Sequence, residues 1–158
     1  MRRFLTIVIL AFLPSIAQAQ PPRAAGECHK LAGIEPSKTD LIRCSQAVTD
    51  AIKKAFEMSG GGTLNKEFGF AVVIHVDGSL VTTPVTGGEA GMWRASLPAD
   101  AVAICHTHRN AVSPRPSDQD LREADRLQIL FFVISNSGLW VYEPSPSGKG
   151  RAYNVQWR

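Results

Sequence analysis

Residues 101–120 read AVAICHTHRNAVSPRPSDQD and join three parts of an α/β domain in one segment. The apolar run from Ala101 to His106 predicts a buried strand. The two prolines that follow indicate a loop, because proline lacks the backbone N–H that a strand ladder needs. Ser117 has the residue type and position of an N-cap, which predicts a helix extending to about Gln128. A strand, a loop and a helix in succession are typical of α/β folds.

Patterns on either side of this segment complete one domain. Asp77-Gly78 is a strong hairpin signal between two apolar runs. We expect a helix over residues 45–58 and strands over 67–76, 80–83, 101–106, 129–134, 139–143 and 151–157. Residues 84–98 are expected to form a long loop whose Met92 and Trp93 cover the core or border a cleft. A chain of 158 residues favours one compact domain, so we predict a single α/β domain with a mixed β-sheet flanked by helices.

The quoted segment also contains metal-ligating residue types at suggestive positions. His106 and His108 lie two residues apart at the end of the predicted strand, so their imidazoles point to the same side of the sheet. Asp120 falls in the first turn of the predicted helix, which the proline-containing loop can return to the strand end. Two imidazoles and one carboxylate leave the fourth position of a tetrahedral zinc site open, which is typical of catalytic zinc. Asp118 is the competing carboxylate ligand.

A zinc hydrolase also needs a base that does not bind the metal and a donor to the developing oxyanion. Zinc lowers the pKa of bound water to about 7, and the base takes up the proton. Glu67 begins the strand predicted over residues 67–76, and its carboxylate reaches the metal site if that strand lies beside residues 101–106. The Ser117 hydroxyl, three residues before Asp120, is the candidate oxyanion donor.

Each of these residues also has a purely structural interpretation. Ser117 and Asp120 suit a helix cap with an acidic first turn, a role that is compatible with catalysis. Glu67 is alternatively a solvated charge at a strand edge. Cys105 lies in an apolar run, where a thiol is more often a small buried hydrophobe than a nucleophile. His75 is interpreted as a surface or packed histidine and not as a ligand.

The order of Glu67, His106-x-His108 and Ser117-x-x-Asp120 resembles the JAMM/MPN metallopeptidase superfamily, and in particular its uncharacterised bacterial JAB-like domains. Members of this superfamily include deubiquitinating isopeptidases. The resemblance covers about residues 67–133 and includes the order of the hairpin and the helix. It implies three zinc ligands, a general acid/base and an oxyanion donor, which correspond to His106, His108 and Asp120, to Glu67, and to Ser117.

The chain departs from the superfamily pattern in two places. Eight residues separate His108 from Ser117, one more than is usual, so Ser113 is the substitute for Ser117 as donor. Arg109 stands where the superfamily often has proline. Together with Arg115, it either keeps the loop solvated or attracts a carboxylate on a substrate.

The first residues have the pattern of an export signal. Arg2 and Arg3 precede an apolar run over residues 4–13, and Ala17-Gln18-Ala19 has the small-x-small form that signal peptidase cuts. The apolar run is too short to span a bilayer, which needs about 20 residues. We therefore expect residues 1–19 to be a signal peptide and the protein to be exported, to the periplasm or out of the cell.

An N-terminal extension is expected over residues 20–44, ahead of a metallohydrolase domain over residues 45–158. Residues 20–40 are rich in proline, alanine and glycine, which predicts a segment that wraps the domain loosely. Cys28 and Cys44 are close enough in sequence to form a disulfide in an oxidising compartment.

These observations predict an exported zinc-dependent hydrolase of peptide or isopeptide amide bonds, with a peptide or protein as substrate. The alternative is a non-catalytic domain of the same fold that binds or scaffolds a partner. The net charge of +3 falls to +1 without Arg2 and Arg3, so no basic surplus favours nucleic acid as a partner. No later apolar run is long enough to span a bilayer, so we expect no membrane contact after signal cleavage.

Overall fold

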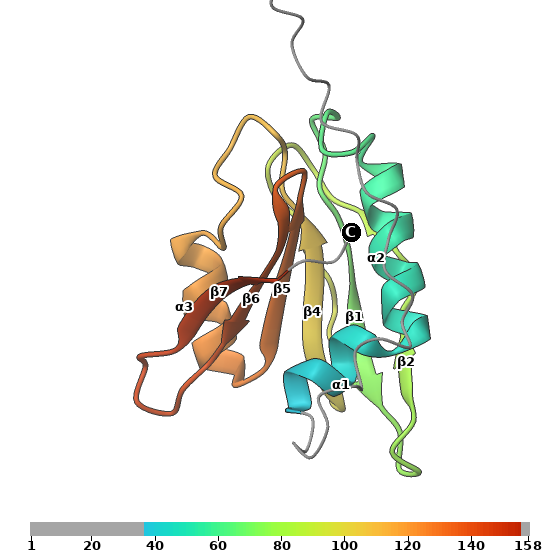
Figure 1. Ribbon diagram of the computed structural model, residues 1–158, viewed down its shortest axis with the longest axis vertical. Helices are drawn as coiled ribbons and strands as arrows, with labels where there is room; N and C mark the ends of the chain where they lie inside the picture. Colours follow the sequence, from blue (N-terminus) through green and yellow to red (C-terminus); the bar gives the residue numbers. More distant parts are fainter. Residues whose placement is uncertain (1–36, 156–158) are drawn as a thin grey trace, which may run out of the picture.

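A mixed β-sheet with helices on both faces forms the centre of the molecule (Figure 1). The computed structural model describes residues 37–155. The elements in chain order are α1 (Lys38–Cys44), α2 (Gln46–Met58), β1 (Phe68–Ile74), β2 (Leu80–Thr82), β3 (Thr86–Gly87), β4 (Ala101–Thr107), α3 (Asp118–Leu127), β5 (Leu130–Ser135), β6 (Gly138–Glu143) and β7 (Arg151–Val155). The strand order is β2-β1-β4-β5-β6-β7, with β3 pairing to β1. The predicted single α/β domain is therefore confirmed.

The β4–α3–β5 unit is the parallel part of this sheet. β4 and β5 run in parallel, with His106 opposite Val133, while the neighbouring pairs of strands are antiparallel. Parallel neighbours require a crossover connection, and α3 provides it. The loop that leaves the carboxyl end of β4 leads directly into the N-terminus of α3. The topology therefore brings the end of β4 and the start of α3, which are the two ends of residues 101–120, close together. Ligands of α/β sheets bind at such carboxyl ends of strands.

Alternating side chains divide the core between the two faces of the sheet. On one face, α1 and α2 cover a cluster that includes Phe70, Cys105 and Phe132. On the other face, α3 covers a smaller cluster that includes Ile104 and Phe131 (Figure 1). Each large side chain that is fully buried in this way contributes roughly 1.5–3 kcal/mol to folding. Two packed faces make the central strands a rigid support for the side chains at their ends.

Three local predictions need correction. Part of the segment expected to wrap the domain loosely is helical, because residues 38–44 form α1. The loop expected over residues 84–98 contains the short strand β3, which pairs with Phe68 and Gly69 of β1. Glu67 lies just before β1 and not within it.

Distant contacts fasten α1 to the sheet. The buried hydroxyl of Thr39 donates to Glu143 Oε1 over 2.7 Å, across 104 positions of the chain. Tyr153 Oη donates to the same oxygen over 2.6 Å. The helix is therefore fastened to β6 and β7 by residues that the local pattern does not contain.

Of the two cysteines within residues 37–155, one is bonded and one is free. Cys44 forms a disulfide, whereas Cys105 carries a free thiol that is completely buried. Burial raises the pKa of that thiol well above its ordinary value, which favours its interpretation as a packed hydrophobe over a nucleophile. Cys28 and the expected signal peptide lie outside the described residues. No helix within residues 37–155 is long and apolar enough to cross a membrane.

Candidate metal centre

His106, His108 and Asp120 come together at the carboxyl end of β4. One ligand atom from each of the three side chains lies within 4.8 Å of the other two. His106 Nε2 is 3.4 Å from Asp120 Oδ1, and His108 Nε2 is 3.5 Å from Asp120 Oδ2. This group can hold a metal ion. The competing candidate, Asp118, is exposed and lies outside the cluster.

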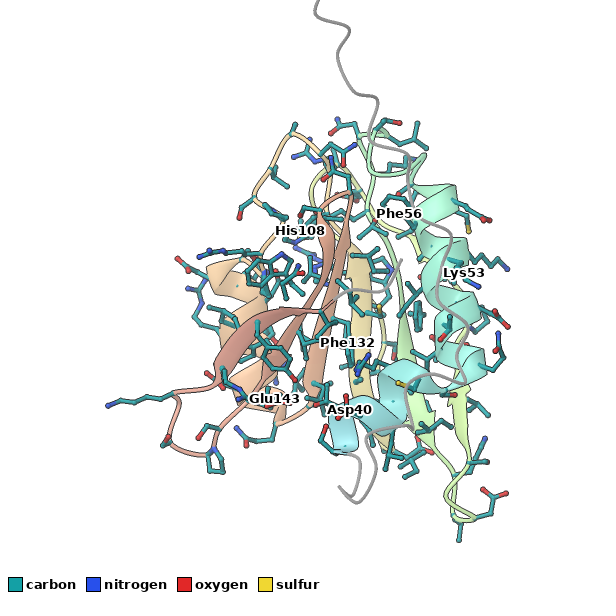
Figure 2. All side chains as sticks on the ribbon, viewed as in Figure 1. Asp40, Lys53, Phe56, His108, Phe132 and Glu143 are labelled. Atoms are coloured by element: carbon teal, nitrogen blue, oxygen red, sulfur yellow. The ribbon has the colours of Figure 1, made fainter. Side chains whose placement is uncertain are left out.

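The end of β4 sets the direction of both imidazoles. His106 is a strand residue paired to Val133 of β5. His108 lies one residue beyond β4, and its backbone N–H donates to the carbonyl of Ile134 over 2.8 Å. This hydrogen bond continues the strand geometry past the assigned end of β4, so the two histidines keep the same side of the sheet. Figure 2 shows His108 between the sheet and α3.

A backbone carbonyl orients the second imidazole. His108 Nδ1 lies 2.9 Å from the carbonyl oxygen of Ser113. Because a carbonyl oxygen only accepts hydrogen bonds, Nδ1 carries a proton, and Nε2, which faces Asp120, is the nitrogen that could bind a metal. Histidine ligands of metals are commonly held in this way through the nitrogen that does not bind. Ser113, predicted as a substitute donor, thus contributes its carbonyl group to the site, and its Oγ accepts from the Arg115 N–H.

The N-terminal cap of α3 orients Asp120. Oδ2 of Asp120 accepts from the Ser117 backbone N–H over 2.6 Å and from the Ser117 hydroxyl over 2.7 Å. The Ser117 Oγ in turn accepts from the Asp120 N–H over 3.2 Å, which completes a capping box. The capping interpretation is therefore correct, and it fixes the same carboxylate that faces the histidines.

The pKa values of the three side chains shift in different directions. Burial opposes ionisation of His108, but its hydrogen bonds with Asp120 and Ser113 and the charges of Asp120 and Glu67 outweigh burial and raise its pKa. Burial, assisted by His108, lowers the pKa of His106 to about 4 although Asp120 opposes this, so His106 is neutral at neutral pH. Burial also opposes ionisation of Asp120, but hydrogen bonds from His108 and Ser117 and the proximity of His106 outweigh it and hold the pKa of the carboxyl far below its ordinary value. A neutral imidazole and an ionised carboxylate are the forms that bind metals.

Glu67 is buried in the wall of the same cavity. Its exposed fraction is only 7%, so the interpretation as a solvated charge at a strand edge is wrong. The carboxylate accepts a hydrogen bond from the Trp93 backbone N–H and is influenced by the charges of His108, Asp120 and Arg109. Burial is the largest influence, and it raises the pKa of Glu67 above its ordinary value. A raised carboxyl pKa beside a metal centre is typical of a group that exchanges protons.

Trp93 contacts both Glu67 and His106. Its ring stacks against His106 with the ring centroids 6.5 Å apart and the planes 7° apart. Its Nε1 donates over 3.1 Å to the carbonyl and the hydroxyl of Thr86. The indole lies directly over Gly69, where a Cβ atom would come within 2.8 Å of the ring. The prediction that Trp93 borders a cleft is therefore confirmed, since it lines the cavity and packs on the core.

Substituting Gly69 by alanine is expected to destabilise the fold by about 1–3 kcal/mol, the usual cost of overpacking. The added Cβ would lie 2.6 Å from the Cys105 carbonyl oxygen and 2.8 Å from the Trp93 ring, so strand and indole must both shift. Denaturant unfolding would measure the loss, and metal titration would show weaker binding as Trp93 leaves His106. Unchanged stability would contradict the close approach of the indole to β1.

The cavity at this site has a volume of about 490 Å³. Both apolar and charged side chains line its wall. The apolar part is contributed by Met92, Trp93, Ala95, Leu97, Ile104, Val112, Leu127 and Phe131. The cavity is large enough for several residues of a peptide, and the ligand cluster forms part of its wall.

Sequence reasoning missed the backbone groups of this site. The carbonyl of Ser113 and the N–H of Trp93 orient His108 and Glu67, yet any residue type supplies these groups. The proline-containing loop was the available signal for the first of them, because it returns the chain to the strand end. His75, which was not expected to be a ligand, is exposed and outside the cluster.

Comparisons with known proteins add little to this geometry. No family model matches the chain, and no curated protein matches it. Among solved structures, the solution structure of a protein from Salinibacter ruber is similar over 69% of this chain and 88% of that chain, with 14% sequence identity and a TM-score of 0.39. Similarity at this level supports no conclusion about fold or function. The functional argument rests on the site itself.

Proposed function

We propose that this protein is a zinc-dependent hydrolase of peptide or isopeptide amide bonds. The observation that carries the proposal is a ligand cluster of His106, His108 and Asp120 in one cavity with the buried carboxylate of Glu67. These residues are the ones whose order in the sequence resembles JAMM/MPN metallopeptidases. The proposal includes export, which is supported by the signal-like N-terminus and by the disulfide at Cys44.

The donor set favours zinc among the divalent metals. Bonds of about 2.0–2.1 Å at tetrahedral angles place neighbouring ligand atoms roughly 3.3–3.4 Å apart. His106 Nε2 lies 3.4 Å from Asp120 Oδ1 and His108 Nε2 lies 3.5 Å from Oδ2, so each imidazole is about this far from one of the two carboxylate oxygens. Two imidazoles and one carboxylate are a common catalytic zinc set. Zinc held there would supply a Lewis acid that polarises a carbonyl and makes water more acidic.

The residues around the cluster supply the other parts of an amide hydrolysis. Glu67 takes a proton from the attacking water and returns it to the leaving amine. Its burial excludes bulk water, and the Trp93 N–H keeps the carboxylate oriented. The Ser117 hydroxyl is the proposed donor to the carbonyl oxygen, and to act it must turn its hydrogen away from Asp120 Oδ2.

That hydrogen bond also favours a second candidate function. The Ser117 hydroxyl is fully used in capping α3, donating to the Asp120 carboxylate and accepting from the Asp120 N–H. A site in which this hydroxyl stays with Asp120 lacks the proposed oxyanion donor. The candidate is then a non-catalytic metal-binding domain that binds or scaffolds a protein partner.

Zinc removal distinguishes the two candidates. We expect the full chain to bind one zinc ion and to release new amino groups from a degenerate peptide library. A chelator should abolish this release and added zinc should restore it, because all proposed chemistry occurs at the ligand cluster. The His75→Ala variant removes an exposed histidine outside the cluster and should behave like the parent protein. Stoichiometric zinc without turnover would favour the non-catalytic domain.

A further inference from the structure

Unpaired arginines line the cavity beside the metal centre. The charged side chains in its wall are Arg94, Arg109, Arg115, Arg126, Glu67, Asp120 and Glu123. Arg126 is neutralised by Glu123, since their side chains approach to 2.6 Å. Among residues 37–155, the other three arginines form no ion pair. The wall therefore has a positive surplus, which a divalent ion at the ligand cluster would increase.

Arg109 is held in a fixed position between two loops. Its Nη1 donates to Oδ1 of Asn65. Its Nη2 lies against Gly91, where a Cβ atom would be only 3.1 Å away. Its Nε is buried without a hydrogen-bond partner. The guanidinium thus lies at the cavity wall without an ion-pair partner, and its positive charge acts on Glu67 as well.

Arg115 lies near the other end of the loop that joins β4 to α3, and an aromatic ring holds it in place. Its guanidinium carbon lies 5.0 Å from the ring centroid of Trp140. Such a cation–π contact fixes the plane of a guanidinium and leaves its N–H edge available for a carboxylate. Arg115 is exposed, so a ligand in the cavity can reach it.

Sheet register places the aromatic ring that holds Arg115 on the same part of the sheet as the ligand cluster. Trp140 is opposite Val133, and Val133 is opposite His106, so the backbone of Trp140 lies two strands away from that of His106. Arg115 and the ligand cluster line the same cavity, so one bound peptide can contact both.

We infer that the cavity selects anionic peptides, namely those with an acidic side chain near the amide that is placed at the ligand cluster. Arg115 binds the carboxylate, and Arg109 adds a fixed positive charge along the path. That such a peptide is a substrate rests on the proposed function, whereas its selection by charge does not depend on cleavage. The same arginines attract an acidic peptide whether or not it is cleaved.

Binding of three peptide pools tests this inference. The probes are coumarin-labelled, amidated octapeptides of random uncharged sequence in which one position is fixed as Glu, Gln or Lys. Fluorescence anisotropy with the full chain, both zinc-loaded and zinc-free, gives their affinities. We expect the Glu pool to bind about tenfold more tightly than the Gln pool, the size of one charge-assisted hydrogen bond. The Lys pool should bind most weakly, and added salt should reduce the preference.

Two variants with the same change in net charge locate the effect. Arg115→Gln should remove most of the preference for the Glu pool. Arg122→Gln is the matched control, because Arg122 is an exposed residue of α3 that does not line the cavity. Equal binding of the Glu and Gln pools, or equal effects of the two variants, would overturn the inference. Hydrolysis without charge preference would support the proposed function and overturn the inference. Charge-selective binding without hydrolysis would support the inference and not the proposed function.

Discussion

The His106→Ala variant is expected to lose stoichiometric zinc binding. His106 is buried, is neutral at neutral pH and directs Nε2 at Asp120, so the variant loses one of the three side chains that could hold the metal. Removing a residue that only hydrogen-bonds to a metal ligand already costs roughly 10–100-fold in metal affinity. Removing a ligand itself should cost more. Elemental analysis after dialysis and a competition titration with a chromophoric chelator would measure the change.

Matched variants separate loss of the ligand from loss of the fold. His75→Ala removes a histidine from the exposed turn after β1 and should retain zinc. Asp120→Asn keeps the shape of a ligand side chain while removing its charge, and should weaken zinc binding without a cavity in the core. Far-ultraviolet circular dichroism would establish that each variant is folded. Full zinc retention in folded His106→Ala would refute the proposed ligand set.

The parts of the fold that depend on local signals were predictable. The β4–loop–α3 unit carries its own signals: an apolar run, two prolines and the N-cap Ser117. The hairpin after β1 follows from Asp77-Gly78, where Gly78 has φ 82°, a conformation that glycine adopts readily. The start of α1 had a local signal that was missed, because Ser37 caps the helix and Asp40 follows three residues later. By contrast, β3 depends on a distant partner: Thr86 pairs with Gly69, and the two residues of β3 do not specify a strand by themselves.

The convergence of the candidate ligands was predictable for a different reason. Side chains two residues apart at a strand end share one side of the sheet, and an acidic first turn follows an N-cap, so residue type and spacing indicated His106, His108 and Asp120. They left Asp118 as a competitor, which the structure places outside the cluster. Burial of Glu67 did not follow from its sequence position. It depends on the loop that returns over β1, where the Gly88 N–H donates to the Glu67 carbonyl over 2.7 Å and Trp93 covers the carboxylate side.

The Glu67→Gln variant is expected to retain zinc and the fold and to lose hydrolysis by about 10²–10⁴-fold, the usual contribution of a general base. Glutamine keeps the size of the side chain, and its carbonyl oxygen can accept the Trp93 N–H, but the amide cannot take up a proton. Zinc affinity should be almost unchanged because Glu67 is outside the ligand cluster. Initial rates at saturating zinc, with zinc content measured on the same sample, would give the ratio.

A second carboxylate on the neighbouring loop provides the control for this ratio. Glu89 is exposed and does not line the cavity, so Glu89→Gln should leave hydrolysis at the parent level. If both variants were equally active, Glu67 would not be the base, and its burial would reflect packing of the loop alone. If Glu67→Gln instead lost zinc together with activity, the carboxylate would belong to the metal coordination. Rate and metal content measured together therefore distinguish a proton carrier from a fourth ligand.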